Sequence, residues 1–187
     1  MNKRILFLVI IILTVISCGS RKTVSHKPNT STVTLRNLTS KFEGQNSYQV
    51  KKILNDAEDF LGTPYKFGGT SKSGLDCSGL VINVYNENKV KMPRRSIDQA
   101  KQGKKIEIWE VKPGDLLFFA TNGNGAVSHV GIEKKKKNRG EITFIHASTS
   151  KRINVTTLNE KYWNKAFLFA KILLYILNYI KKKKKNL

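Results

Sequence analysis

Few residues of this chain could carry out nucleophilic, acid–base or metal chemistry. Its 187 residues include two cysteines, Cys18 and Cys77, and three histidines. Cys77 follows Asp76, which stands where the N-cap of a helix would be. The exposed N–H groups and dipole of a helix N-terminus are expected to lower the pKa of the thiol and to bind an oxyanion. This position predicts a nucleophile, although a small buried thiol without a chemical role is the alternative.

The histidines strengthen the case for a nucleophile. His129 lies in SHVGI and His146 in FIHAS, on two neighbouring predicted strands that could bring both rings to the helix N-terminus. An imidazole can take the thiol proton and return it to a leaving amine, while a third group fixes its tautomer. Zinc is the rival use of one Cys and two His, but structural zinc takes four ligands and no fourth stands out. We expect no metal and no other cofactor.

The N-terminus has the pattern of an export signal. Lys3 and Arg4 precede an apolar run, residues 5–16, which is too short for a bilayer span of about 20 residues. The run ends Val-Ile-Ser-Cys, which resembles the lipobox of bacterial lipoproteins and implies lipidation of Cys18. A plain signal peptide or a short membrane anchor is the alternative. If Cys18 carries lipid, Cys77 has no disulfide partner in an oxidising compartment, so it needs another reason to exist.

Composition divides the whole chain into four segments. Residues 1–17 are the expected signal, residues 18–47 the lipidated cysteine and a polar, flexible tether, residues 48–174 a folded domain, and residues 175–187 a basic tail. Within the domain, apolar spacing predicts a helix over 50–61, a second helix from the Asp76 cap to about Asn88, and a short third helix opened by a capping box at Ser96–Gln99. Strands are expected over residues 116–120, 127–133, 142–146, 152–156 and 167–174. Helices followed by strands indicate an α+β domain with an antiparallel sheet.

Six segments together resemble one family. PYKFGG, LDCSGL, MPRRSIDQA, KPGDLLFF, SHVGI and FIHAS, in this order, are similar to the NlpC-type bacterial cell-wall cysteine peptidases, over about residues 50–173. The resemblance implies a papain-like α+β fold with N-terminal helices packed on a small antiparallel sheet. It also implies cleavage of peptidoglycan stem peptides through a thioester, typically between D-γ-glutamate and the following diamino acid.

The resemblance also implies a role for each site residue. Cys77 would be the nucleophile, His129 the general base and His146 the residue that orients it. The Tyr65 hydroxyl and the Cys77 backbone N–H would stabilise the oxyanion. The residues implied in substrate binding are Tyr65, Asp76, Ser78, Arg94 and Ser128. Asp76 and Ser78 resemble contacts to a free substrate amine, although Asp76 could be only a helix cap and Tyr65 only a loop-packing residue.

The formal charge of +21 is partly clustered, in Lys134–Lys137 and Lys181–Lys185. Basic patches are attracted to the anionic polymers and lipids of cell envelopes, but solvated turn and tail lysines are the simpler interpretation. The C-terminal tail could lie on a membrane as an amphipathic helix or be an ordinary packed extension. An export signal and the lack of a recognised binding module argue against nucleic acid.

These observations predict an exported, lipid-anchored and monomeric peptidase whose partner is peptidoglycan. Gly19 follows Cys18 where an Asp would retain a lipoprotein in an inner membrane, which favours the outer membrane in a cell with two. The alternatives are a non-catalytic wall-binding lipoprotein on the same scaffold, and an amidase or acyltransferase that forms a thioester on another acyl donor.

Overall fold

The computed structural model describes residues 34–136, 140–150 and 152–173. The helices are α2 (Tyr48–Glu58), α3 (Cys77–Glu87), α4 (Ser96–Gln99) and α5 (Lys161–Ala166), with a 3-10 turn η1 (Ile108–Glu110). The strands are β1 (Thr70–Ser71), β2 (Gly74–Leu75), β3 (Lys104–Ile106), β4 (Leu116–Phe119), β5 (His129–Lys136), β6 (Ile142–Ser148), β7 (Arg152–Thr157) and β8 (Phe167–Ile172). Within these ranges, no helix has the length and apolar character needed to cross a membrane.

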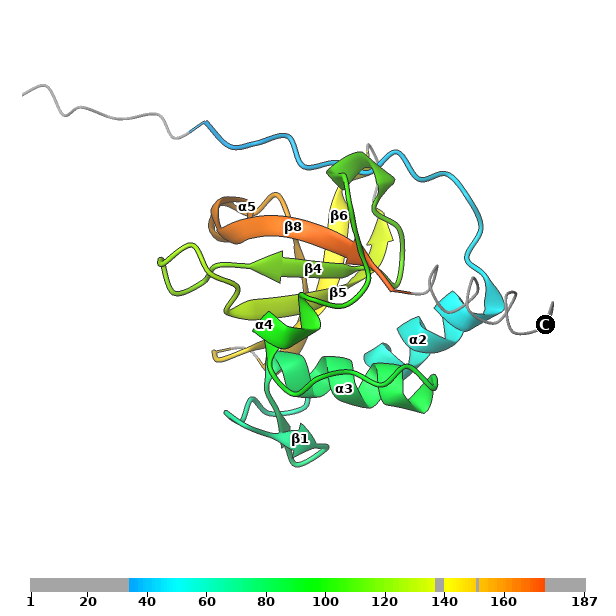
Figure 1. Ribbon diagram of the computed structural model, residues 1–187, viewed down its shortest axis with the longest axis vertical. Coiled ribbons are helices and arrows are strands. Elements are labelled where there is room, and N and C mark those ends of the chain that lie inside the picture. Colours follow the sequence, from blue (N-terminus) through cyan, green and yellow to red (C-terminus); the bar gives the residue numbers. More distant parts are fainter. Residues whose placement is uncertain (1–33, 137–139, 151, 174–187) are drawn as a thin grey trace, which may run out of the picture. The chain divides into compact units, whose positions relative to one another are not determined.

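Six strands form one antiparallel sheet in the order β3-β8-β4-β5-β6-β7, and β1 and β2 form a separate small hairpin. Consecutive strands from β4 to β7 are neighbours, whereas β8 returns from the end of the described domain to lie between β3 and β4. In Figure 1, α2 and α3 lie side by side below the sheet. The α+β fold with helices packed on an antiparallel sheet is therefore confirmed.

The sheet separates two apolar cores. Along β4 the side chains alternate between them, as a period of two requires, with Leu116 and Phe118 in one core and Leu117 and Phe119 in the other. The first core contains the buried faces of α2 and α3. The second lies on the opposite face and includes residues of β6, α5 and β8. The sheet is thus covered on both faces, and β6 contributes buried side chains to both cores.

The helix boundaries follow the caps. The Ser47 side chain accepts a hydrogen bond from the Val50 N–H and starts α2 two residues before the predicted helix, which ends at Glu58 rather than residue 61. Ser96 does not cap α4, because the N-cap position is taken by Arg95, whose carbonyl accepts the first helical hydrogen bonds. The predicted capping box there is wrong. The short elements β1, β2, β3, η1 and α5 were not predicted.

The segment just before α2 packs on the domain, although it was expected to belong to the flexible tether. Leu38 is buried in the second core, Thr39 forms a bridge with Glu141, and the Ser40 N–H donates to the Gly140 carbonyl at 2.9 Å. In Figure 1 this blue segment crosses above the sheet. The predictions for Cys18, for residues 1–33 and for the tail 174–187 lie outside the described residues.

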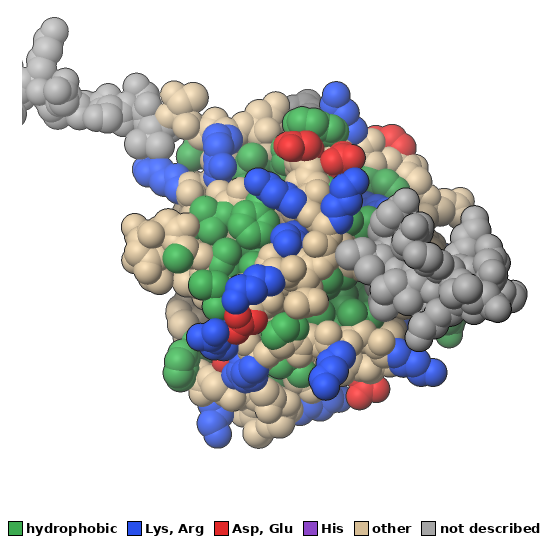
Figure 2. All heavy atoms as spheres, viewed as in Figure 1, with side chains coloured by type: hydrophobic (Ala, Val, Ile, Leu, Met, Phe, Trp, Pro, Cys, Tyr) green, Lys and Arg blue, Asp and Glu red, His purple; other side chains and the backbone are tan. Residues whose placement is uncertain are grey.

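Basic side chains of the described domain are dispersed on the face that Figure 2 shows. Lys134, Lys135 and Lys136 belong to strand β5 rather than to the predicted turn, and Lys134 forms an ion pair with Glu58 on α2 at 3.2 Å. Figure 2 shows Lys and Arg side chains dispersed over one face, among apolar and neutral polar groups. On this face, the positive charge does not gather into one patch.

Candidate active site

A cleft of about 770 Å³ brings the sequence-predicted residues together. Its walls come from the loop before β1, the start of α3, the first residue of β5, the end of β6 and helix α5. The predicted site residues that line it are Tyr65, Asp76, Cys77, Ser78, Arg94, Ser128, His129 and His146. The fold therefore gathers into one cleft all the residues that the sequence assigned to catalysis and substrate binding.

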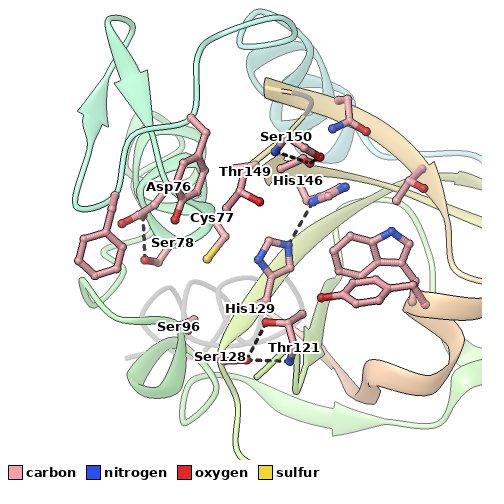
Figure 3. Close-up of a pocket in the computed structure, with 18 of the residues that line it drawn as sticks. Asp76, Cys77, Ser78, Ser96, Thr121, Ser128, His129, His146, Thr149 and Ser150 are labelled. Atoms are coloured by element: carbon pink, nitrogen blue, oxygen red, sulfur yellow. Dashed lines mark hydrogen bonds between the residues drawn. The ribbon is translucent and has the colours of Figure 1, made fainter. Parts of the chain in front are cut away.

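Cys77 is the first residue of α3, and its placement depends on tight packing at the start of that helix. The Asp76 side chain caps α3 by accepting from the Gly79 N–H at 2.7 Å. A Cβ atom on Gly79 would lie 2.1 Å from the Gly69 carbonyl oxygen, so only glycine lets the helix approach the loop this closely. In Figure 3 the Cys77 side chain and the His129 ring lie beside each other in the cleft.

His129 and His146 form a hydrogen-bonded pair. They lie on the adjacent antiparallel strands β5 and β6, and His129 Nε2 is 3.1 Å from His146 Nδ1. The two residues, His129 and His146, are 9% and 2% exposed. If His129 Nε2–H donates to His146 Nδ1, the His129 Nδ1 atom is unprotonated and can accept a proton on its other side. This is the tautomer that a base facing Cys77 requires.

Burial keeps both partners of the Cys–His pair neutral. It raises the pKa of Cys77 to about 11, with a further contribution from the Asp76 charge, although backbone N–H groups, first that of Val130, act in the opposite direction. Burial, followed by the neighbouring His146, lowers the pKa of His129 to about 3. The expectation that the helix N-terminus lowers the thiol pKa was therefore wrong in its net direction. Loss of hydration on burial outweighs the modest helix-dipole effect.

Asp76 is the centre of a charged cluster beside Cys77. Its carboxylate accepts from Arg94 at 2.6 and 3.1 Å, from the Ser78 hydroxyl at 3.1 Å, and from the Gly79 and Gly68 N–H groups at 2.7 and 3.0 Å. Burial alone would raise the pKa of Asp76, but these hydrogen bonds, first that of Arg94, hold it below its usual value. Asp76 is therefore both the predicted helix cap and a group of the cleft whose surroundings favour its charged form.

Three further residues line the cleft outside the Asp76 cluster and the histidine pair. They are Tyr65, Ser128 and Arg95. Tyr65 forms a parallel bridge with Leu75, and burial, then the charges of Cys77 and Asp76, raises its pKa, so its hydroxyl belongs to the same electrostatic environment as the thiol. The Ser128 hydroxyl is engaged by the Thr121 N–H at 2.8 Å and secures the loop between β4 and β5. Arg95 lines the cleft but pairs with Asp98.

Trp163 is a residue of the cleft that sequence reasoning missed. It lies on α5, and its ring centroid is 4.5 Å from that of His146 and 5.2 Å from that of His129. The same ring packs against Phe119 and Phe144 of the second core. No spacing or motif in the sequence marks it, because the six-residue helix that carries it has no recognisable periodicity.

The chemistry available here is covalent catalysis by a thiol. A nucleophile, an oriented base and N–H and O–H donors for an oxyanion are the parts that acyl transfer needs. Within the described part of the chain, no three His, Cys, Asp or Glu side chains are grouped as a metal site would be.

Comparisons with known proteins agree with this geometry. A family model described as the NlpC/P60 family matches residues 62–171. The chain belongs to the NlpC/P60 family of cysteine peptidases. Family membership confirms the resemblance read from the six sequence segments.

The named relatives of this NlpC/P60 chain include two bacterial peptidases. The probable endopeptidase NlpC of Escherichia coli is 39% identical over 120 residues, covering 63% of this chain and 75% of that protein. The gamma-D-glutamyl-L-lysine dipeptidyl-peptidase of Bacillus subtilis is 40% identical over 115 residues, covering 60% of this chain and 37% of that protein. A crystal structure of an NLP/P60 family protein similar to lipoprotein, from Staphylococcus aureus, superposes with a TM-score of 0.61 and 31% identity. That match covers 74% of this chain and 44% of the other, so this NlpC/P60 chain spans less than half of the solved protein.

Proposed function

We propose that this NlpC/P60 protein is an endopeptidase that hydrolyses peptidoglycan stem peptides with Cys77 as its nucleophile. The observation that carries the proposal is the cleft that Cys77, at the start of α3, shares with a histidine hydrogen-bonded to a second histidine at 3.1 Å. The name of the E. coli relative supports an endopeptidase, and that of the B. subtilis relative, a dipeptidyl-peptidase, supports the D-γ-glutamyl–diamino acid bond.

Proton transfer is coupled to attack in this proposal, because the thiol and the imidazole are both neutral at rest. His129 Nδ1 accepts the Cys77 proton as the sulfur bonds to the carbonyl carbon, and His146 Nδ1 stabilises the resulting imidazolium by accepting its Nε2–H. The Cys77 N–H and the Tyr65 hydroxyl donate to the oxyanion.

Collapse of the tetrahedral intermediate breaks the C–N bond and leaves the acyl group on sulfur. The imidazolium gives its proton to the leaving amine, which departs neutral. His129 then takes a proton from water, which attacks the thioester and releases a carboxylic acid and the Cys77 thiol. The cycle consumes one water and leaves each residue in its starting protonation state.

Asp76, Ser78 and Arg94 are proposed to recognise the free amine of the stem peptide. Five donors already surround the Asp76 carboxylate, so an ammonium group must share or replace the Arg94 contact. The Arg94 side chain is 40% exposed and lies at the open side of the cluster, where such an exchange is feasible. Ser128 lines the same cleft and contributes to its floor through the loop that it secures.

We further propose that the protein is exported and anchored to the cell envelope by lipid on Cys18, with residues 1–17 removed. This rests on the sequence pattern and on the cell-wall relatives. Metabolic labelling with a fatty-acid probe tests it, with Cys18→Ala as the control. Labelling that persists in Cys18→Ala would contradict the anchor.

The two rival functions use the same cleft differently. A non-catalytic wall-binding protein would not need a hydrogen-bonded histidine pair beside a thiol, so the intact constellation disfavours it. An amidase or acyltransferase would use the same thioester but release different products. Product analysis therefore separates all three.

The experiment is a digest of purified peptidoglycan with residues 19–187, beside Cys77→Ala, with products identified by mass spectrometry. We expect fragments ending in γ-glutamate that the control lacks. A parallel digest of a synthetic stem peptide with a free or an acetylated N-terminus tests amine recognition, and only the free peptide should be cut. Digests identical to the control would refute the peptidase, and cleavage of another bond would refute the proposed specificity.

A further inference from the structure

The Trp163 ring packs against both histidines of the His129–His146 pair. Its ring meets His146 edge-on, at 70°, and lies tilted by 32° over His129. The planes of the two imidazoles are at 81° to each other, so each of the three rings contacts the other two on different sides. A rotation of either imidazole away from the Nε2–Nδ1 hydrogen bond therefore also changes its packing against the indole.

Helix α5, which carries Trp163, has little stability of its own. It has six residues, and its N-cap, Glu160, makes no side-chain capping bond to the helix. Helices this short are unstable without tertiary contacts. Its position must therefore come from what packs on it.

The N-terminal strap, defined as residues 34–41, holds α5 from outside. Asn164, next to Trp163 and 1% exposed, accepts from the Arg36 N–H at 3.0 Å and donates to the Arg36 carbonyl at 2.7 Å. The Arg36 guanidinium donates to the Asn164 carbonyl and, at 2.8 Å, to the Phe167 carbonyl at the end of α5. Asn159 donates to the Leu38 carbonyl at 3.2 Å.

We infer that Trp163 is a positioning residue for the His129–His146 pair and that the N-terminal strap keeps it in place by pinning α5 through Arg36 and Asn164. This inference rests on the proposed function for its kinetic consequence. Its structural part, the link from strap to indole, stands independently. The strap follows the proposed tether in the sequence, so the described residues next to that tether also support the active site.

The kinetic test compares Trp163→Phe and Trp163→Leu. Phenylalanine keeps an aromatic face against the imidazoles, whereas leucine fills space without one. Because small misplacements of catalytic groups cost up to about 100-fold in rate, we expect Trp163→Leu to lower kcat by about 10- to 100-fold with KM little changed. Trp163→Phe should recover most of this loss. Equal kcat in wild type and Trp163→Leu would overturn the positioning role.

The structural test needs no substrate. In a Trp109→Phe background, Trp163 is the sole indole of the 187-residue chain. Arg36→Ala removes the guanidinium contacts at an exposed position, so the variant should fold, and Arg36→Lys keeps one cationic donor. Lys41→Ala is the matched control, because Lys41 contacts the domain through its backbone N–H, which alanine retains.

We expect Arg36→Ala to increase acrylamide quenching of Trp163 fluorescence by about two-fold or more, since the indole becomes more mobile and accessible. Arg36→Lys should lie between wild type and Arg36→Ala, and Lys41→Ala should match wild type. Alanine at position 36 keeps the two backbone bonds to the Asn164 side chain, which Asn164→Ala removes. Unchanged quenching in both Arg36→Ala and Asn164→Ala would overturn the link to the strap. If the protein cleaves no stem peptide but quenching changes as expected, the proposed function fails and the link from strap to indole survives.

Discussion

The atom through which His146 contacts His129 makes a sharp prediction about which substitutes preserve activity. The bond runs from His129 Nε2 to His146 Nδ1 at 3.1 Å. In asparagine, Oδ1 occupies the same position along the side chain as Nδ1 of histidine, whereas in glutamine the acceptor lies one bond farther out. His146→Asn should therefore keep the acceptor in place, and His146→Gln and His146→Ala should not.

The magnitude follows from burial. His129 is 9% exposed and His146 2%, so loss of the acceptor leaves a buried N–H unsatisfied at a cost of about 1–3 kcal/mol. If this cost applies to the transition state, in which the His129 ring is an imidazolium, kcat/KM of His146→Ala should fall by about 5- to 150-fold. We expect His146→Asn to remain within about five-fold of wild type on the same scale.

The assay is cleavage of a free-amine stem peptide followed by chromatography, over a range of pH. Because His146 contributes to lowering the pKa of His129, the acid limb of the His146→Asn profile should shift toward neutral pH. Melting temperatures identify variants that lose activity by unfolding. Glutamine as active as asparagine, or alanine as active as wild type, would refute the assigned geometry.

Three further expectations follow from other parts of the structure. Iodoacetamide should alkylate Cys77 at a rate that rises about tenfold per pH unit from pH 7 to 10, since its pKa is raised to about 11; a plateau below pH 8 would mean that the thiolate is already formed. Burial raises the pKa of Asp115 to about 7, so the stabilisation from its bound proton is complete below the usual pKa of 3.8 and is lost as the pH rises to about 7. In Asp115→Asn, the free energy of unfolding measured in urea should change less across this pH window than in the wild type, by a few kcal/mol at most. An unchanged slope against pH would contradict the assignment. Gly79→Ala should destabilise the fold by about 1–3 kcal/mol, because its Cβ would overlap the Gly69 carbonyl; an unaffected melting temperature would show that α3 tolerates displacement.

Local chemistry explains what could be predicted. The Asp76 cap and the α3 start that follows it depend on a hydrogen bond spanning three residues, to Gly79, so the sequence alone reveals them. Strands β4 to β8 were predicted because β-rich apolar runs separated by turns are a local signal. The candidate residues Cys77, His129 and His146 are recognisable by type and by family motif, and their gathering in one cleft agrees with that motif.

The protonation of Cys77, the packing of the N-terminal strap and the contacts of Trp163 depend on groups that are distant in the sequence. The neutral state of Cys77 comes from burial in the folded domain, and no local rule gives the balance between lost hydration and the helix dipole. The packing of the N-terminal strap on α5 pairs Arg36 with Asn164, 128 residues later. Trp163 acquires its contacts with the histidines only when α5 docks against β6. Sequence therefore determined which groups could react, and long-range packing determined their protonation and orientation, because hydration and ring contacts depend on neighbours that only the folded chain supplies.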